Sequence, residues 1–346
     1  MYTGPNIDSS GLVFAVDAGS ERSYPSRGIA TTWVDYANNQ ANYTLLGDDG
    51  IYIKNTYANW IGYFPATVVT VGSYTVQFDY IADASSVLVL DNDGIHDNTY
   101  NVNLNATTST QSHTGTVNIT TTGDIKFYLR RNSGGNITVT NFRYFKSDIW
   151  NDLSSNENNG TLVNGVVFST SNSGTLTFDG TDDYINLNNA VLIDPSQGTF
   201  TGWVKLAASN NNHAGIFTSQ TGPSWAAMRF VVNIYPPNKI RFVISDGSSA
   251  TNDSCVSNTA LSYNEWYYIA CTYDGTSMKI YLNGVLDDTF TTTKVPGTYT
   301  PNATMIGSQN YSNRYFNGAI NIVKIYNTVL TATEVGQNYN AYKNRF

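Results

Sequence analysis

The sequence KIYLNGVL at residues 279–286 decides the fold class of this chain. Asn283 and Gly284 separate two apolar-rich runs, and both residue types tolerate the positive φ that a tight two-residue turn between antiparallel strands requires. The pattern therefore predicts a β-hairpin in which residues 279–282 pair with the residues that follow Gly284.

Similar patterns recur on both sides of this hairpin. Apolar and polar residues alternate over residues 74–80, with the period of two that is typical of a half-buried strand. Residues 137–144 indicate another strand, interrupted by a bulge. A third strand is indicated around residues 200–206, where Phe200 and Val204 share one face and Trp203 lies on the other. Further strands are predicted near residues 228–235, 239–245, 266–273, 278–282 and 319–326.

One helix stands out at the C-terminal end. Thr331 and Glu334 have the spacing of a capping box, in which each side chain accepts a hydrogen bond from a backbone amide at the helix start. Val335, Tyr339 and Tyr342 then fall on one face of a helix. The pattern predicts a short C-terminal helix that packs on the sheets.

The amino-acid composition is typical of a β-sheet protein, and the charge argues against a nucleic-acid partner. A length of 346 residues suits two domains, and only 13% of the residues are charged, so Asn, Thr, Ser and Tyr supply the polarity. With a net charge of −8 and no basic run longer than Arg130–Arg131, we expect no nucleic-acid partner. No stretch approaches the roughly 20 apolar residues of a membrane helix, and residues 1–5 do not look like a secretory signal.

A repeated phrase indicates how the domains are arranged. TWVD at residues 32–35 and IWNDLS at residues 149–154 share a Trp-x-Asp, and each is followed by an Asn-rich stretch. The residues between them form a strand-rich module of their own. We therefore expect one domain made of residues 1–35 and 147–346, with a second domain, residues 36–146, inserted into it. The alternative is two consecutive domains and a chance repeat.

Residues 150–346 resemble the concanavalin A-like/laminin-G superfamily. The resemblance rests on the order and spacing of LTFDGTDDYI (176–185), FTGWV (200–204), WYYIACTYDG (266–275), YLNG (281–284), FNGAI (316–320) and IYNTVLTATEV (325–335). It implies an all-β chain: a concanavalin A-like/laminin-G β-sandwich with a short C-terminal helix. The segment 36–146 would be an inserted, second jelly-roll-like β-sandwich, similar to carbohydrate-binding modules.

A narrower resemblance concerns the two ends of the sequence. GLVFAVDAG at residues 11–19, followed by SYP at residues 23–25, is similar to the opening of phage virion proteins that carry this sandwich. In those proteins the opening runs directly into a Trp-x-Asp-Leu-Ser phrase like the one at Trp150. QNYNA at residues 337–341 is similar to the C-terminal end of those phage proteins.

The sequence does not predict an enzyme. A glycosidase of this superfamily needs two carboxylates that flank the scissile bond, and the four glutamates are not near one another: Glu21, Glu157, Glu265 and Glu334. The three histidines, His96, His113 and His213, all fall in expected loops, and no sequence motif of a serine hydrolase or a phosphate-binding loop is present.

Sugar binding would instead use exposed aromatic side chains as stacking platforms, next to amides and carboxylates that bind hydroxyl groups. The candidates in loop-like stretches are Tyr57, Trp60 and Tyr63 in the insert, and Trp225, Tyr311 and Tyr315 in the sandwich. The alternative is that these aromatic residues belong to the core, which is common in a chain with 13% aromatic residues.

Calcium is the one cofactor that the sequence suggests. Asp91, Asp93 and Asp97 have the spacing of part of an EF-hand loop, although Val102 stands where that loop has its closing Glu. Ordinary turn chemistry is the alternative. For Asp179–Asp183 we expect a structural turn, and for Cys255 and Cys271 buried free thiols rather than a disulfide.

These observations predict a non-catalytic phage virion surface protein, a tail or head fibre or a capsid decoration, located on the virion surface and assembled in the host cytoplasm. Its expected partners are host surface glycans, other virion proteins and further copies of itself, with a trimer as one form. The alternatives are a secreted bacterial carbohydrate-binding lectin or adhesin, and a polysaccharide-active enzyme.

Overall fold

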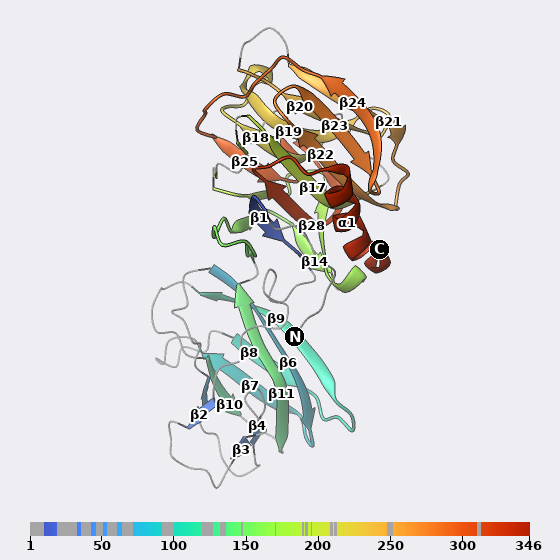
Figure 1. Ribbon diagram of the computed structural model, residues 1–346. Helices are drawn as coiled ribbons and strands as arrows, with labels where there is room; N and C mark the ends of the chain where they lie inside the picture. Colours follow the sequence, from blue (N-terminus) through green and yellow to red (C-terminus); the bar gives the residue numbers. More distant parts are fainter. Residues whose placement is uncertain are drawn as a thin grey trace. The chain divides into compact units, whose positions relative to one another are not determined.

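The structure is a computed structural model in which the chain divides into two compact units (Figure 1). One unit comprises Met1–Tyr24 and Ile149–Phe346, and the other comprises Pro25–Asp148. The residues that the structure describes are 10–18, 33–35, 43–45, 51–53, 61–63, 72–91, 100–119, 127–131, 136–146, 148–169, 171–188, 190, 193–194, 196–207, 210, 213–247, 252–309 and 313–346.

The first unit, which we call the sandwich unit, contains two eight-stranded antiparallel sheets. Sheet 1 has the order β14 (Val167–Ser169), β15 (Thr175–Asp179), β28 (Asn317–Tyr326), β17 (Gly198–Leu206), β22 (Trp266–Tyr273), β23 (Ser277–Leu282), β24 (Val285–Thr291), with β1 (Leu12–Val16) also paired to β28. Sheet 2 has the order β12 (Ile149–Trp150), β13 (Gly160–Val163), β16 (Tyr184–Asn186), β25 (Ala303–Ile306), β18 (Gly215–Gln220), β19 (Met228–Tyr235), β20 (Lys239–Ile244), β21 (Asp253–Ala260). The hairpin of β26 (Ser308–Gln309) and β27 (Arg314–Tyr315) is separate from both sheets.

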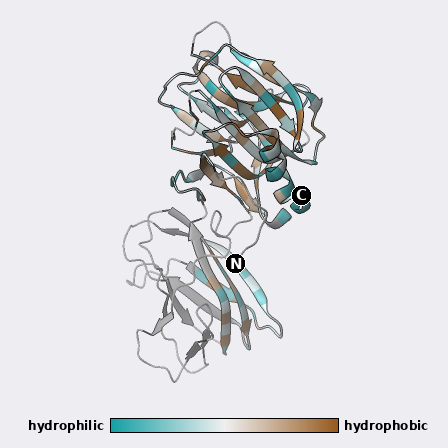
Figure 2. Ribbon diagram, viewed as in Figure 1, coloured by the Kyte–Doolittle hydropathy of each residue, from teal (hydrophilic) through white to brown (hydrophobic). Residues whose placement is uncertain are grey.

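An apolar layer between the two sheets holds this unit together. Phe200 of sheet 1 stacks on Phe217 of sheet 2 with ring centroids 5.5 Å apart, and Phe230 and Phe242 extend the layer within sheet 2. All four side chains are fully buried. Hydrophobic residues accordingly gather in the strands, while the connecting loops are largely hydrophilic (Figure 2). Burying this apolar surface is the main stabilising contribution to the unit.

The outer face of sheet 1 is partly covered by the C-terminal segment. Helix α1 (Ala332–Tyr342) is followed by the 3-10 helix η4 (Lys343–Arg345). Trp203 packs between Tyr339 and Phe346, with centroid separations of 5.7 and 4.3 Å. Thr331 caps the helix in the predicted capping box, because its side chain accepts from the Glu334 amide and Glu334 accepts from the Thr331 amide.

The second unit, which we call the Pro25–Asp148 unit, contains two five-stranded antiparallel sheets. One has the order β2 (Trp33–Asp35), β5 (Ile61–Tyr63), β10 (Phe127–Arg131), β7 (Ser86–Asp91), β8 (Tyr100–Leu104). The other has the order β3 (Tyr43–Leu45), β4 (Ile51–Ile53), β11 (Ile137–Lys146), β6 (Gly72–Ala82), β9 (Gln111–Ile119). Both sheets contribute buried apolar side chains, among them Phe78 and Phe142 from the second sheet and Val102 from the first.

The predicted all-β fold with a short C-terminal helix is confirmed, and so is the hairpin at residues 279–286, in which Leu282 pairs with Val285. The expected bulge in residues 137–144 is present, because the pairing of β11 with β6 shifts register between Thr140 and Arg143. Cys255 and Cys271 are buried and free, and the Cys255 thiol donates a hydrogen bond to Asp288. No helix in the described part of the chain is both long and apolar enough to span a membrane.

The boundaries of the Pro25–Asp148 unit differ slightly from the predicted segment 36–146, because β2 already pairs with β5 of this unit. The flanking strand β1, in contrast, pairs with β28 of the sandwich unit, with Val16 opposite Val323. The sandwich unit is therefore built from two pieces of sequence that lie on either side of the other unit.

Candidate functional site

A hollow of about 290 Å³ opens on the outer face of sheet 1, beside the area that the C-terminal segment covers. We call it the sheet-1 hollow. Its lining residues come from β14, β15, β17, β28 and adjoining turns: Ser169, Ser171, Thr175, Thr177, Phe178, Lys205, Leu206, Ala207, Asn264, Asn317, Gly318 and Ala319. Its volume is near the lower end of the roughly 300–1,000 Å³ typical of small-molecule sites.

Strand pairing explains why a hollow forms here. Ala319 of β28 pairs with Thr177 of β15 on one side and with Lys205 of β17 on the other. Neighbouring strands are about 4.8 Å apart, so the Cα atoms of Thr177 and Lys205 lie about 10 Å apart across a methyl group. The small side chain of Ala319 thus forms the floor, and the two longer side chains form opposite walls.

Lys205 supplies the positive charge of the hollow. Alternation along β17 places it on the same face as Trp203, away from the buried Phe200. Its ammonium nitrogen lies 5.3 Å from the centre of the Trp266 ring, within the range of a cation–π contact. The Trp266 ring is fixed in turn, because its Nε1 donates to Asn172 Oδ1 at 3.2 Å.

Hydroxyl and amide groups supply the other polar atoms of the lining. The Ser169 hydroxyl donates to Ser171, and the Thr175 and Thr177 hydroxyls donate to the backbone oxygens of Ser171 and Val167. Because each of these hydroxyl oxygens has further lone pairs, they can still accept hydrogen bonds from a ligand. Asn264 is exposed at the rim, where it adopts a φ of 63°.

A glycine is required at the edge of the hollow. Gly318 has a φ of 151°, and a Cβ atom at this position would collide with the backbone oxygen of Lys205. The close approach of β28 to β17 at this point therefore depends on the absence of a side chain. This is the physical reason for a glycine between Asn317 and Ala319.

A second hollow, of about 230 Å³, lies in the Pro25–Asp148 unit, where β6, β9 and β11 meet. The Asp79 carboxylate accepts hydrogen bonds from Ser112 Oγ and Asn141 Nδ2, both at 2.6 Å. The ring of His113 stacks on Phe78 with centroids 5.0 Å apart, and burial lowers the pKa of this histidine. The predicted loop position of His113 is wrong, because it lies within β9.

These groups do not form a catalytic triad. Register pairs Phe78 with His113 and Asp79 with Ser112, so the imidazole and the Ser112–Asp79 pair belong to opposite faces of the sheet. His213 lies in a turn before β18, with its ring against Tyr235 at 5.5 Å, and His96 lies outside the described residues.

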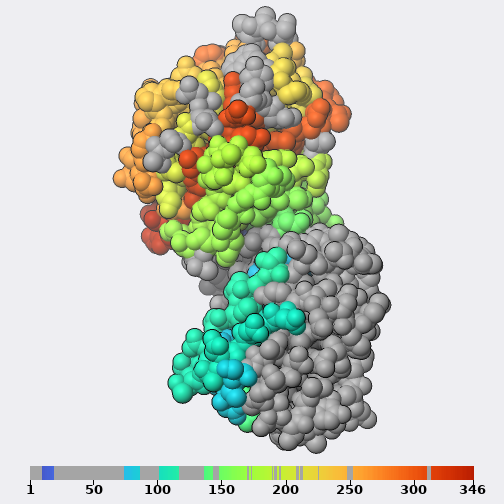
Figure 3. Space-filling model, turned by 180° about the vertical axis from the view of Figure 1, so that it is seen from behind, coloured from blue at the N-terminus to red at the C-terminus, as the bar shows by residue number. Residues whose placement is uncertain are grey.

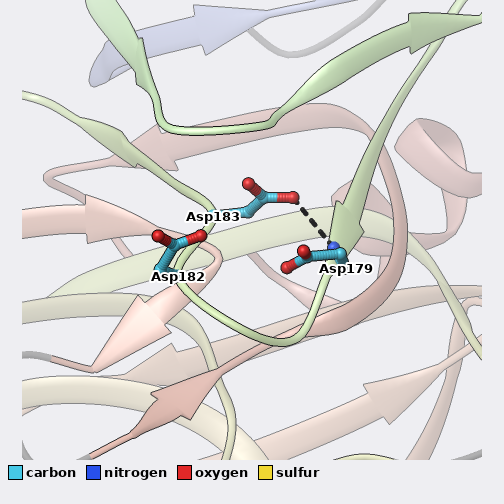
Figure 4. A group of neighbouring side chains, drawn as sticks. All are labelled: Asp179, Asp182 and Asp183. Carbon is cyan, nitrogen blue, oxygen red and sulfur yellow. Dashed lines mark hydrogen bonds between the residues drawn. The ribbon is translucent and has the colours of Figure 1, made fainter.

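Three aspartates gather at the end of β15, and each offers an oxygen within 4.8 Å of the others (Figure 4). Asp183 is buried and accepts from the amides of Gly165 and Asp179 at 2.6 and 2.9 Å. Asp179 accepts from the Thr181 amide at 2.7 Å. Burial raises the pKa of Asp183, and the two amides oppose this shift. The contacts with the Asp179 and Thr181 amides lie within the turn, as a structural turn predicts, whereas Gly165 is 18 residues away in the sequence.

The structure places only some of the sequence-predicted site residues. Tyr315 is half-buried in β27, two residues before Asn317 of the sheet-1 hollow, but it is not among the lining residues. Tyr63 lies in β5, Trp225 in the 3-10 helix η3 (Trp225–Ala227) and Asp91 at the end of β7. For these three residues the structure describes the backbone but not the side chain. Tyr57, Trp60, Tyr311, Asp93 and Asp97 lie outside the described residues.

Sequence reasoning missed the residues that line the sheet-1 hollow. Thr177, Phe178, Asn317, Gly318 and Ala319 all belong to the stretches LTFDGTDDYI and FNGAI, which carried the family resemblance. Lys205 directly follows a third such stretch, FTGWV. A search for polar residues on the outward face of these stretches would have found the walls. In Figure 3 the green segment that contains β13 to β16 is exposed on the surface of the sandwich unit.

Comparisons with known proteins identify the sandwich. Residues 178–336 match the family model Laminin_G_3, described as the concanavalin A-like lectin/glucanases superfamily, so this segment is a domain of that superfamily. Among curated protein sequences no significant match was found.

Solved structures with a similar arrangement include the binding domain of Paraclostridial Mosquitocidal Protein 1, with 16% identity, coverage of 58% of this chain and 51% of that chain, and a TM-score of 0.46. Domain 4 of an extracellular arabinanase from Geobacillus stearothermophilus, in complex with arabinotriose, has 18% identity, coverage of 56% and 92%, and a TM-score of 0.43. The botulinum neurotoxin type G receptor binding domain has 20% identity, coverage of 55% and 48%, and a TM-score of 0.43. The chain thus spans about half the length of the first and third of these structures.

Proposed function

Because residues 178–336 form a concanavalin A-like lectin/glucanase domain, we propose that the chain is a non-catalytic carbohydrate-binding protein that acts in adhesion. The observation that carries this proposal is the sheet-1 hollow, whose lining combines hydroxyls, amides and one ammonium group with a small apolar floor at Ala319. A sugar ring has the matching properties, since its hydroxyl groups need hydrogen-bonding partners and its C–H faces contact apolar atoms.

The lining also supports binding without bond cleavage. Retaining and inverting glycosidases both require two carboxyl groups that flank the glycosidic bond. Among the described residues that line the hollow, none carries a carboxyl group. The closest carboxylate along β15, that of Asp179, accepts a hydrogen bond from the Thr181 amide of its own turn and is not among the lining residues.

We further propose that the chain acts on the surface of a phage particle, as part of a fibre or as a capsid decoration. This finer proposal is supported by the opening GLVFAVDAG and the close QNYNA, which are similar to phage virion proteins with this sandwich. Its partners would be host surface glycans, neighbouring virion proteins and further copies of the chain, because repeated copies raise the avidity of weak sites.

A glycan panel tests the carbohydrate-binding proposal. The wild-type chain is compared with Thr177→Val, which removes a wall hydroxyl but keeps the β-branched shape, and with Asn264→Gly, which removes a rim amide but allows the positive φ. We expect each variant to weaken binding about three- to tenfold, the value of one hydrogen bond.

Thr289→Val on β24 is the matched control, because Thr289 is exposed at the opposite edge of the same sheet. Its affinity should equal that of the wild type. If the wild-type chain retains no glycan, or if both hollow variants bind as well as the control, the proposed site is wrong. Release of reducing ends from a bound glycan by wild type would contradict the non-catalytic part.

The virion proposal needs a separate measurement. Phage particles whose genome encodes this sequence are purified and digested, and their peptides are identified by mass spectrometry. We expect peptides of this chain in stoichiometric amounts, and antibody labelling on the outside of intact particles. Detection of the chain only in the particle-free medium would favour a secreted lectin instead.

A further inference from the structure

We propose that the sheet-1 hollow selects a sugar that carries an anionic group, and that Lys205 binds this group. The inference rests on the proposed carbohydrate-binding function and names the class of sugar that the site takes. The ligands are therefore acidic glycans, with a carboxylate or a sulfate on the ring, rather than neutral ones.

The charge of the lining is opposite in sign to that of the whole chain. The chain as a whole is acidic, with 26 Asp and Glu residues against 18 Lys and Arg residues. In the sheet-1 hollow this balance is reversed, because Lys205 is the only charged residue among the described residues that line it. A ligand that brings its own negative charge would complement this site, whereas a neutral sugar would leave the ammonium group without a charged partner.

The Lys205 ammonium group is held in place by its surroundings but has no carboxylate partner among the described residues. β17 is fixed by pairing on both sides, with Ala319 and Trp266 opposite Lys205. The nitrogen lies over the Trp266 ring, which Asn172 orients and which packs against Phe346 at 4.8 Å. Within the described part of the chain no aspartate or glutamate forms an ion pair with Lys205. A positioned cation loses less freedom when a ligand binds.

The position of Asp179 indicates how a bound acidic sugar is oriented. Asp179 lies on the same strand face as Thr177, two residues further along β15, so it is about 7 Å from the wall opposite Lys205. Its carboxylate accepts a hydrogen bond from the Thr181 amide at that end of the hollow. The anionic group of the sugar should therefore point towards β17 and β22, and the hydroxyl-bearing edge of the ring towards β15.

The test is isothermal titration of the full chain with oligosaccharides that contain a hexuronate or a sulfated hexose. Each is compared with its neutral counterpart, in which the carboxyl group is reduced or the sulfate removed. The variants are Lys205→Met, which keeps the length and apolar character of the stem, and Lys279→Met on β23 as the control in the same sheet. The wild type and the control should bind at least one acidic form about tenfold more tightly than its neutral counterpart.

In Lys205→Met this preference should fall to less than about twofold, while the affinity for the neutral form stays unchanged. Equal affinity of the wild type for acidic and neutral forms would overturn the inference and leave the carbohydrate-binding proposal intact. So would an acidic preference that persists in Lys205→Met. If neither form binds the wild type while its thermal unfolding shows a folded chain, the carbohydrate-binding proposal fails as well.

Discussion

Asp152 Oδ1 accepts a hydrogen bond of 2.9 Å from the backbone nitrogen of Ala15, 137 residues earlier in the sequence. The same carboxylate accepts from the amides of Ser154 and Asn158, and from the Ser154 hydroxyl at 2.7 Å. The backbone oxygen of Val13 accepts in return from the side chains of Ser154 and of the asparagines that follow. Residues 152–158 thus form hydrogen bonds that hold β1 in place within the sandwich unit.

This arrangement predicts that Asp152→Ala destabilises the sandwich unit by about 2–3 kcal/mol, because a charged acceptor is removed from several amides at once. Chemical denaturation measures the loss. Hydrogen exchange at the Ala15 amide should accelerate, since this amide loses its Asp152 acceptor.

Asp274→Ala is the control for this change, because Asp274 also accepts several hydrogen bonds but only from its own turn, at Thr276 and Ser277. It should leave the exchange rate at Ala15 unchanged. Equal effects of the two variants on Ala15 would mean that Asp152 does not fasten β1.

A buried lysine predicts an unusual dependence of stability on pH. Lys324 of β28 is only 6% exposed, and its nitrogen lies 4.7 Å from the centre of the Tyr342 ring of α1. Burial lowers the pKa of Lys324 to about 7, although the negative charge of Asp17 opposes this shift. Asp17 itself pairs with Arg345 at 2.8 Å.

The sign follows from the protons that each state binds. Below pH 7 the folded chain holds a buried ammonium group, and the cost is fully present. Between about pH 7 and 10.5 the unfolded chain binds one more proton than the folded chain, so this cost is relieved as pH rises, by up to about 1.4 kcal/mol per pH unit. Lys324→Met should therefore be more stable than wild type at pH 6, by about 1–4 kcal/mol.

The measurement is denaturation of both proteins at several pH values from 6 to 9, and the difference between them should shrink steadily above pH 7. The buried thiols add a background, because burial raises the pKa of Cys255 and Cys271 and so lowers stability once the unfolded thiols ionise. That background is common to both proteins and cancels in the difference. A constant difference across the pH range would show that Lys324 keeps one protonation state.

The capping box of α1 supplies a third prediction. Thr331→Ala removes the acceptor for the Glu334 amide and should cost about 1 kcal/mol of stability. Thr333→Ala, an exposed change within the first turn, is the control and should change stability by less than about 0.5 kcal/mol. Thermal unfolding of the two variants compares them directly, and equal losses would contradict a specific role for the cap.

The elements that the sequence predicted are those whose signals are local. The Asn283-Gly284 turn and the Thr331–Glu334 cap each lie within a few residues, and alternation along β17 places Trp203 opposite Phe200. In these cases the residues that interact are close in the sequence, so the pattern alone contains the geometry.

The sheet-1 hollow could not be predicted in the same way. Thr177, Ala319 and Lys205 form its walls and floor, yet Ala319 is more than 100 residues from either partner in the sequence. Alternation shows which face a side chain occupies, but it does not show which strands are neighbours. The predicted binding residues were exposed aromatic side chains in loops, whereas the polar groups that line this hollow are hydroxyls, amides and one ammonium group.

The most direct test is a crystal structure of the full chain with a bound acidic oligosaccharide. We expect an uncleaved sugar ring above Ala319, between Thr177 and Lys205, with its anionic group within hydrogen-bonding distance of the Lys205 nitrogen. A sugar bound elsewhere on the chain with this hollow left open, or a cleaved product within it, would contradict the proposed non-catalytic site.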